Sequence, residues 1–300
     1  MTLHVTKGHG TRNDFVLLDD PQGALDLTPA LVRALADRRA GVGGDGVIRL
    51  VRSEATPDAA VALAEAPDAA WFMDYRNADG SVAEMCGNGV RVVAAFAERL
   101  GVWDGTGELP LATRAGVRRV RRVAAPLGEV ADWYEVDMGA WELSAGPRAV
   151  DAGGDAEVAI AGLEVARPAL SVDVGNPHTV VALADEAALG AADLTRAPLV
   201  APAPPHGTNV ELVVPLGEGP DGVGRLRMRV HERGVGETES CGTGACAAAI
   251  AVRTWAGDGA PEAWWVDVPG GTLRVRVVGR RVLLAGPAEL TYEADVPVAR

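Results

Sequence analysis

The sequence predicts an α/β fold made of two similar domains, and two observations lead to this prediction. Strand-like and helix-like segments mix along all 300 residues, a length that allows two domains with separate cores. One motif also occurs twice: Cys-Gly-x-Gly opens an apolar run at Cys86 and again at Cys241. A motif that returns with its surroundings indicates a repeated structural unit. We therefore expect two related units, each with one cysteine at the start of a helix.

The first elements follow from local patterns. Residues 15–18 (FVLL) and 47–50 (VIRL) are apolar, β-branched runs typical of strands. A helix is expected from Thr28 to Arg38, because Thr28 suits an N-cap and Pro29 suits the first helical position.

Further strands are expected at residues 71–75, 130–137 and 273–278. Residues 53–69 are rich in Ala and Pro with little patterning, so we expect a surface excursion there. Residues 197–207 contain several prolines and are expected to form a connector.

The run after Cys86 has helical periodicity. Its apolar stripe recurs at intervals of three and four residues and stops before Gly101, which suits a helix C-terminus; the stripe is Val90, Val93, Ala94, Ala97 and Leu100. The run after Cys241 repeats this arrangement and ends near Gly257.

Flanking positions support the repeat. The same number of residues separates Asn13 from Gly46 and Asn176 from Asn209. The next interval, to the cysteine, is longer in the first half, where residues 53–69 look inserted.

A cysteine at a helix start is suited to acid–base chemistry. The helix N-terminus carries partial positive charge, which lowers the pKa of a thiol placed there. Gly87 and Gly89, like Gly242 and Gly244, let first-turn amides approach an anion. Each motif could therefore supply a base and a cradle for a carboxylate.

Two such thiols suit the inversion of a carbon centre. One removes a proton from one face while the other delivers a proton to the opposite face, with neither group moving. The alternative for any free cysteine is a small buried hydrophobe, and this is what we expect of Cys246, which lies inside an Ala-rich run.

Composition excludes several classes of protein. The net charge of −13 disfavours nucleic acid, no apolar run approaches the roughly 20 residues that span a bilayer, and no signal segment opens the chain, so a cytoplasmic location is expected. The only lysine is Lys7, which disfavours a pyridoxal-phosphate Schiff base. Three cysteines suit neither a disulfide framework nor a zinc cluster, so neither cofactor nor metal is expected.

Over nearly its whole length the chain resembles diaminopimelate epimerases. The motifs that carry the resemblance stand in the family's order: Asn13-Asp14-Phe15-Val16, Asn77-Ala78-Asp79-Gly80-Ser81, Cys86-Gly87-Asn88-Gly89, Gly175-Asn176-Pro177-His178, Glu232-Arg233-Gly234, Gly236-Glu237-Thr238, Cys241-Gly242-Thr243-Gly244-Ala245 and Pro269-Gly270-Gly271.

The resemblance implies two pseudo-symmetric domains, each a sheet or barrel wrapped around a central helix. The first would comprise residues 1–127, with 286–300 returning to it, and the second residues 128–285. The active site would lie in the cleft between them. It also implies a cytoplasmic homodimer that interconverts LL- and meso-diaminopimelate, a step toward lysine and peptidoglycan.

By matching, Cys86 and Cys241 are the acid/base pair. Gly87, Asn88, Gly242 and Thr243 form the carboxylate cradles. The remaining substrate-binding residues, which chiefly hold the distal amino-acid end, are Asn13, Asn77, Asn176, Asn209, Glu232 and Arg233. His178 is expected to orient its neighbours or to pack, rather than to act as the base.

The chain departs from the family pattern at two positions. Arg12 stands where a glycine usually precedes Asn13, and Gly46 stands where some members carry a substrate-contacting glutamine.

The sequence leaves two alternative functions open. A proline or hydroxyproline racemase of the same fold typically has His after the first Cys-Gly, where this chain has Asn88. A non-catalytic amino-acid-binding or thiol-redox protein would not need two Cys-Gly-x-Gly motifs.

Overall fold

The computed structural model describes residues 2–146 and 148–298, which form two compact units. Unit 1 contains residues 1–137 and 285–300, and unit 2 contains residues 138–284. The first boundary lies further along the chain than the expected one after residue 127, because residues 132–137 belong to a strand of unit 1. In the part of the chain that is described, no helix is long and apolar enough to cross a membrane.

The strands of unit 1 close into a barrel. From β1 to β7 each strand pairs with the next one, β7 pairs with β18, and β18 pairs with β1. Their bounds are β1 Thr2–Gly10, β2 Asn13–Asp19, β3 Gly46–Arg52, β4 Trp71–Asn77, β5 Leu109–Thr113, β6 Gly116–Val123, β7 Asp132–Ala140 and β18 Arg281–Pro297. The barrel part of the fold prediction is therefore confirmed in unit 1.

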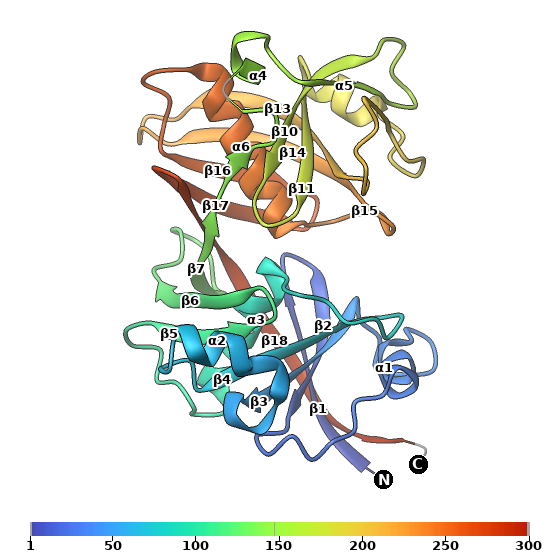
Figure 1. The fold of residues 1–300 in the computed structure, drawn as a ribbon, viewed down its shortest axis with the longest axis vertical. Coiled ribbons are helices and arrows are strands. Elements are labelled where there is room, and N and C mark those ends of the chain that lie inside the picture. The colour runs from blue at the N-terminus through green and yellow to red at the C-terminus, as the bar shows by residue number, and fades with distance from the viewer. Residues whose placement is uncertain (1, 147, 299–300) are drawn as a thin grey trace. The chain divides into compact units, whose positions relative to one another are not determined.

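The helix α3 (Gly87–Arg99) packs against β1, β2, β3 and β6, and Figure 1 shows the strands of unit 1 around it. Eleven of its residues, from Gly87 to Ala97, are buried, so the helix is buried on nearly all sides rather than along one stripe. The periodic stripe predicted the helix but understated its burial.

The other helical segments of unit 1 cover the barrel. The helix α1 (Pro29–Ala36) begins as predicted, with Thr28 accepting from the Leu31 amide, but ends two residues before Arg38. The expected surface excursion at 53–69 instead contains two 3₁₀ turns, η1 (Ser53–Ala55) and η2 (Pro57–Ala59), and the helix α2 (Ala60–Glu65). Most of the segment lies at the surface as expected, but its helical turns were not predicted, and Ala59, Ala62 and Ala69 pack into a small core with β4 and β5 residues.

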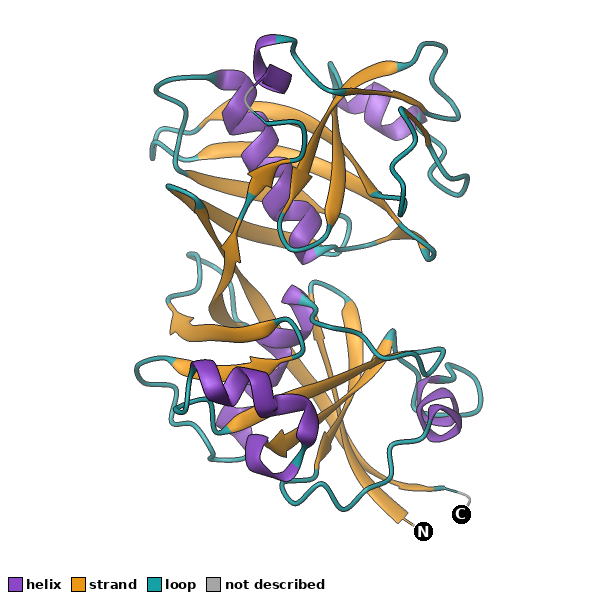
Figure 2. Ribbon diagram, viewed as in Figure 1, coloured by secondary structure: helices purple, strands orange, loops and turns teal. Residues whose placement is uncertain are grey.

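Unit 2 has the same construction. Its strands are β8 Glu142–Leu143, β9 Ala156–Ala159, β10 Arg167–Asp173, β11 Pro177–Ala182, β12 Leu199–Ala201, β13 Asn209–Glu218, β14 Gly224–Glu232, β15 Gly236–Thr238, β16 Ala263–Val268 and β17 Gly271–Val278. Its helices are α4 Arg148–Asp151, α5 Glu186–Ala191 and α6 Gly242–Ala256. The helix α6 packs against six of these strands, and Figure 2 shows it among them.

The two units repeat one sheet topology. In unit 1 the pairs β1–β2, β3–β4 and β5–β6 are antiparallel, while β2–β3 and β4–β5 are parallel. In unit 2 the sequence β10, β11, β13, β14, β16, β17 alternates in the same way. Even the register agrees, since Phe15 pairs with Gly46 and His178 pairs with Asn209. The internal repeat is thus a repeat of structure.

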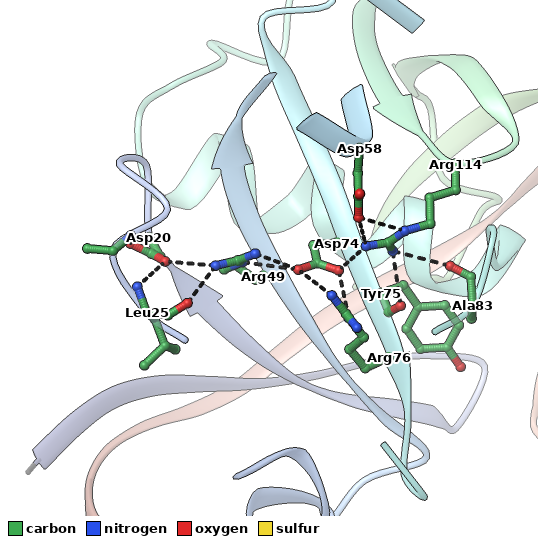
Figure 3. Close-up of polar contacts among 10 residues, drawn as sticks. Asp20, Leu25, Arg49, Asp58, Asp74, Tyr75, Arg76, Ala83 and Arg114 are labelled. Atoms are coloured by element: carbon green, nitrogen blue, oxygen red, sulfur yellow. Dashed lines mark hydrogen bonds and ion pairs between the residues drawn. The ribbon is translucent and has the colours of Figure 1, made fainter. Parts of the chain in front are cut away.

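A buried carboxylate holds the middle of unit 1 together. Asp74 is 1% exposed and accepts hydrogen bonds from Arg49, Arg76 and Arg114 (Figure 3). Arg114 also donates to the carbonyls of Tyr75 and Ala83. The network therefore ties β4 to the segment that leads into Cys86.

Candidate active site

Cys86 is the N-cap of α3. Its backbone is extended, with φ −141° and ψ 122°, and its Sγ accepts from the amide of Gly89 at 3.5 Å. It thus occupies the place that Ser or Asp fills in many helices. The side chain is partly exposed, and its Sγ also donates to Oδ1 of Asn13 at 3.5 Å.

Asn13 and Asn88 form one hydrogen-bonded pair beside Cys86. Asn88 Nδ2 donates to Asn13 Oδ1 at 3.2 Å, and Asn13 Nδ2 donates to a carboxylate oxygen of Asp45 at 2.7 Å. At the other end, Nη2 of Arg91 donates to Asn88 Oδ1 at 3.1 Å. A guanidinium only donates and a carboxylate only accepts, so the two charged ends fix how both amides point.

Asn77 lies at the same edge of the barrel. Asn13 begins β2, Gly46 begins the parallel strand β3, and Asn77 ends β4 directly opposite Gly46. A Cβ at position 46 would lie 2.5 Å from both the Tyr75 ring and the carbonyl of Arg76. Packing therefore excludes a glutamine here, and no side chain at position 46 can reach a ligand in this chain.

Cys241 caps α6 in the same manner as Cys86 caps α3. Its backbone has φ −124° and ψ 115°, and its Sγ accepts from the Gly244 amide at 3.4 Å. Sγ also lies 3.5 Å from Oγ1 of Thr243. Unlike Cys86, Cys241 is buried, with 7% of its surface exposed. The predicted pairing of each cysteine with a helix start is confirmed.

The expectation that the helix start lowers the thiol pKa is wrong for Cys241. Burial raises its pKa well above the ordinary value, and the carboxylates of Glu232 and Glu211 raise it further. The hydrogen bonds from Thr243 and Gly244 act in the opposite direction but are outweighed. Desolvation and two negative neighbours therefore favour the thiol over the thiolate at this position.

His178 connects Asn176 to a buried carboxylate. Its Nε2 lies 3.0 Å from Asn176 Oδ1, and its Nδ1 lies 2.6 Å from Glu211 Oε1. Both His178 and Glu211 are at most 1% exposed. The ring therefore orients its neighbours, as the sequence led us to expect.

The remaining predicted residues lie at the equivalent edge of unit 2. Asn209 begins β13, and its Oδ1 accepts from the amide of Arg233 at 2.9 Å. Glu232 ends β14 and accepts from the Thr238 hydroxyl. Arg233 Nη1 donates to the carbonyl of His206 at 2.6 Å. Asn209 and Arg233 are thus joined directly, while Asn176 reaches them through the pairing of β11 with β13.

Sequence reasoning missed Asp45, Arg91 and Glu211. Arg91 is the only charge in the first eleven residues of α3 and is fully buried, and Glu211 interrupts an otherwise apolar stretch of β13. A charge inside an apolar run was the available signal, because such a residue needs partners.

Three observations on the only lysine, on metal ligands and on cavities complete the description of the site. Lys7 Nζ lies 2.6 Å from Asp14 Oδ2, with its side chain 12% exposed. Across residues 2–146 and 148–298, no group of three or more His, Cys, Asp or Glu side chains is placed to hold a metal ion. Cavities of about 680 Å³ and 310 Å³ are lined by other residues.

The geometry agrees with a known family. The family described as Diaminopimelate epimerase matches residues 5–140 and 170–291. A diaminopimelate epimerase from Streptomyces coelicolor is 49% identical, over 96% of this chain and 93% of the relative. The chain belongs to the diaminopimelate epimerase family.

Solved structures extend the likeness of fold beyond this epimerase family. A phenazine biosynthesis protein of the PhzF family from Bacillus anthracis aligns with 99% of this chain and 100% of its own, with a TM-score of 0.66 and 16% identity. A hydroxyproline epimerase from Agrobacterium vitis aligns with 98% of this chain and 92% of its own, with a TM-score of 0.60 and 14% identity. At such identities the likeness shows only that this chain has the same fold as these proteins.

Proposed function

We propose that this protein epimerises diaminopimelate at one α-carbon, between the LL- and meso-forms, with Cys86 and Cys241 as its acid/base pair. The observation that carries the proposal is the repeated cap geometry: each cysteine is the N-cap of the central helix of its own unit. In this proposal each sulfur acts on one face of the substrate's α-carbon.

The chemistry balances without an added reagent. The thiolate of one cysteine takes the α-proton, and the electron pair left on carbon spreads into the α-carboxylate. Amides at the helix starts stabilise the negative charge that develops there. The thiol of the other cysteine then gives its proton to the opposite face of the planar carbon. One thiolate and one thiol remain after turnover, with their roles exchanged.

The cradle residues follow from the same geometry. Gly87, Asn88, Gly242 and Thr243 occupy the first turns, where amides lack helical partners. The distal amino acid would lie against Asn13, Asn77, Asn176, Asn209, Glu232 and Arg233. A guanidinium and a carboxylate among these residues suit the two charges of a second zwitterion.

The reaction is proposed to need no cofactor. The engagement of Lys7 with Asp14 supports this, because the only lysine is already held by a carboxylate within unit 1. We also infer a cytoplasmic homodimer that serves lysine and peptidoglycan synthesis.

Hydrogen exchange at the α-carbon tests the proposal. The protein is incubated in deuterated water with LL-diaminopimelate and, separately, with L-proline, and label and configuration are measured. We expect deuterium at the α-carbon and meso-product from diaminopimelate only. Exchange with proline alone would instead favour a proline racemase. Exchange with neither compound would favour a non-catalytic protein.

A further inference from the structure

The chain that leads into each cysteine has the same length in both units. Residues 78–85 lie between the end of β4 and Cys86, and residues 233–240 lie between the end of β14 and Cys241. We call these two stretches, which are equally long, the approach segments. Each cysteine is therefore held by its helix on one side and by its approach segment on the other.

Each approach segment folds back antiparallel along the strand that precedes it. In unit 1 Val82 bridges to Arg76, and in unit 2 Glu237 pairs with His231. Arg76 and His231 hold the same place in the shared strand register, so Val82 and Glu237 occupy equivalent positions. The side chains there differ in chemistry, because Val82 is apolar and 53% exposed whereas Glu237 carries a charge.

In unit 2 the carboxylate of Glu237 is held by two parallel hydrogen bonds. Arg229 Nε donates to Glu237 Oε1 at 2.7 Å, and Arg229 Nη2 donates to Oε2 at 3.0 Å. The same guanidinium donates through Nη1 to the carbonyls of Leu189 and Ala192 at the C-terminal end of α5, at 2.6 and 2.9 Å. Because all three nitrogens of this planar group are engaged, Arg229 fastens the approach segment to both β14 and α5.

Unit 1 fastens its approach segment with the opposite charge on the strand. Asp74 stands at the place that Arg229 has in the strand register, and Arg114 Nη2 donates to Asp74 Oδ1 at 2.6 Å (Figure 3). Arg114 Nη1 donates to the carbonyl of Tyr75 in β4 and to that of Ala83 in the approach segment, each at 3.4 Å. Arg114 therefore links strand and approach segment in unit 1, as Arg229 does in unit 2.

Equivalent hairpin turns also contact the two approach segments. Arg114 lies in the two-residue turn that joins β5 to β6. The corresponding turn between β16 and β17 is Pro269-Gly270, and the Gly270 amide donates to the carbonyl of Glu239 at 2.9 Å. In each unit the turn thus holds the approach segment just before the cysteine, by a side chain in unit 1 and by the backbone in unit 2.

The barrel does not dictate these ion pairs. β4 and β14 keep the same pairing pattern although Asp74 is negative and Arg229 is positive. The pair of Arg229 with Glu237 is partly exposed, with 22% and 28% of the side chains accessible, and such pairs add little to stability. What the two arrangements share is the fastening of the approach segment, which indicates that the fastening is their purpose.

We propose that Arg229 with Glu237 in unit 2, and Arg114 in unit 1, are positioning residues that fix Cys241 and Cys86 for proton transfer by fastening the approach segments. The part of this inference that concerns catalysis rests on the proposed function, whereas the fastening itself does not. Proton transfer requires the sulfur to lie close to the α-carbon, and a misplacement of about 1 Å can lower the rate by about 10²-fold.

Steady-state kinetics of two Glu237 variants test the positioning in unit 2. In Glu237→Ala we expect kcat to fall roughly 10- to 100-fold, while KM changes by less than about threefold because Arg233 keeps its contact with Asn209. Glu237→Gln retains one oxygen that accepts from Arg229 and should recover part of kcat. Glu218→Ala, which removes an exposed carboxylate at the far end of β13, is the control and should match wild type.

Amide hydrogen exchange, followed by peptide mass spectrometry, tests the fastening without turnover. In Glu237→Ala we expect residues 233–240 to exchange roughly tenfold faster and residues 78–85 to keep wild-type rates. Arg114→Lys should show the reverse, because lysine keeps a charge for Asp74 but lacks the fork that reaches the carbonyls. Each variant is thus the control for the other, and the lysine leaves Asp74 paired so that unit 1 stays folded.

Wild-type exchange in the approach segment that a variant should release would overturn the inference. Equally faster exchange in both units would also overturn it, because that indicates a general loss of stability. Local release with a wild-type kcat would show that the fastening does not position the cysteine. If wild type exchanges no α-hydrogen of diaminopimelate while both segments respond as expected, the fastening stands and the proposed function fails.

Discussion

Arg91 and Asp45 are the two charged ends of one hydrogen-bond relay. Arg91 donates to Asn88, Asn88 donates to Asn13, and Asn13 donates to Asp45. The relay leaves Asn13 Oδ1 as the acceptor that faces Cys86. Two amides whose orientation would otherwise be free are thereby fixed in unit 1.

Replacement of Asp45 by asparagine should weaken substrate binding. The new amide can donate as well as accept, so Asn13 is free to turn its nitrogen toward Cys86. We expect KM to rise roughly tenfold, in line with one or two lost hydrogen bonds, with a smaller change in kcat. Steady-state kinetics check this, and Asp45→Glu, which keeps an acceptor-only group, should lose less. Equal KM values for Asp45→Asn and wild type would contradict the role of the relay.

Replacement of either cysteine by serine should abolish most turnover and leave the fold intact. Serine is a good N-cap, so the helix start keeps its hydrogen bond, but a hydroxyl is a far weaker base than a thiolate. We expect a loss of roughly 10²- to 10⁴-fold in epimerisation, measured by the LL/meso ratio with time. Circular dichroism should show wild-type secondary structure. Full turnover by either variant would refute the assignment.

The sequence predicted the parts of this molecule that depend on local signals. Thr28 and Pro29 predicted the start of α1, and the two Cys-Gly-x-Gly motifs predicted the starts of α3 and α6. Such predictions succeed because caps and glycines determine the backbone conformation within a few residues. The repeat could be found for the same reason. The helical turns within residues 53–69 were not predicted because their small alanines find a partner only in the folded chain, where β4 and β5 lie alongside.

Electrostatics of the site could not be predicted in the same way. The sequence placed Cys241 at a helix start but could not place Glu211, which is 30 residues away along the chain and approaches through β13. The hydrogen bond from the Gly244 amide at the helix start does act to lower the pKa of Cys241, yet burial and two carboxylates outweigh it. A pKa depends on the sum of distant neighbours, and that sum exists only in three dimensions.

Alanine at Gly244 and at Gly89 should have unequal effects on stability. In a helix, alanine is more favourable than glycine by up to about 1 kcal/mol. At Gly244, however, its Cβ would meet the Glu211 carboxylate at 2.7 Å, and that group is held by His178. At Gly89 the nearest atom is the flexible end of Met73, at 2.8 Å. We expect Gly244→Ala to lower the free energy of unfolding by about 1–3 kcal/mol and Gly89→Ala to change it by less, as urea unfolding would show. The reverse order would contradict the packing.

Asp74 should make the stability of unit 1 depend on pH in the acid range. Burial by itself would raise the pKa of Asp74, but hydrogen bonds from Arg76 and Arg114 hold it below the ordinary value of 3.8. A depressed folded-state pKa gives stability that is complete above the unfolded-state value and is lost as the pH falls toward the folded-state value. We therefore expect Asp74→Asn to cost about 3 kcal/mol at pH 7 and progressively less below about pH 4.

Urea unfolding of wild type and Asp74→Asn at pH 7, 5, 4 and 3 measures that difference. The exposed Asp26, replaced by asparagine, is the control and should give nearly the wild-type curve at each pH. A stability difference between wild type and Asp74→Asn that stays constant from pH 7 to pH 3 would contradict the prediction. It would show that the negative charge of Asp74 is not the source of the stabilisation by the three arginines.

Glycine at position 12 should stabilise the protein. Thr11 and Arg12 form the two-residue turn between β1 and β2, with φ of 50° and 64°, as a hairpin of this length favours. A left-handed conformation destabilises a non-glycine residue by roughly 1–2 kcal/mol. Glycine avoids this strain, but it lowers the stability by about 0.5–1 kcal/mol because it loses more conformational entropy on folding. The net gain for Arg12→Gly should be about 0.5–1 kcal/mol. Arg12→Ala, which removes the same side chain but keeps the strain, should show no such gain in thermal or urea unfolding. If both variants gained equally, the side chain of Arg12 rather than its backbone would be the source of the strain next to Asn13.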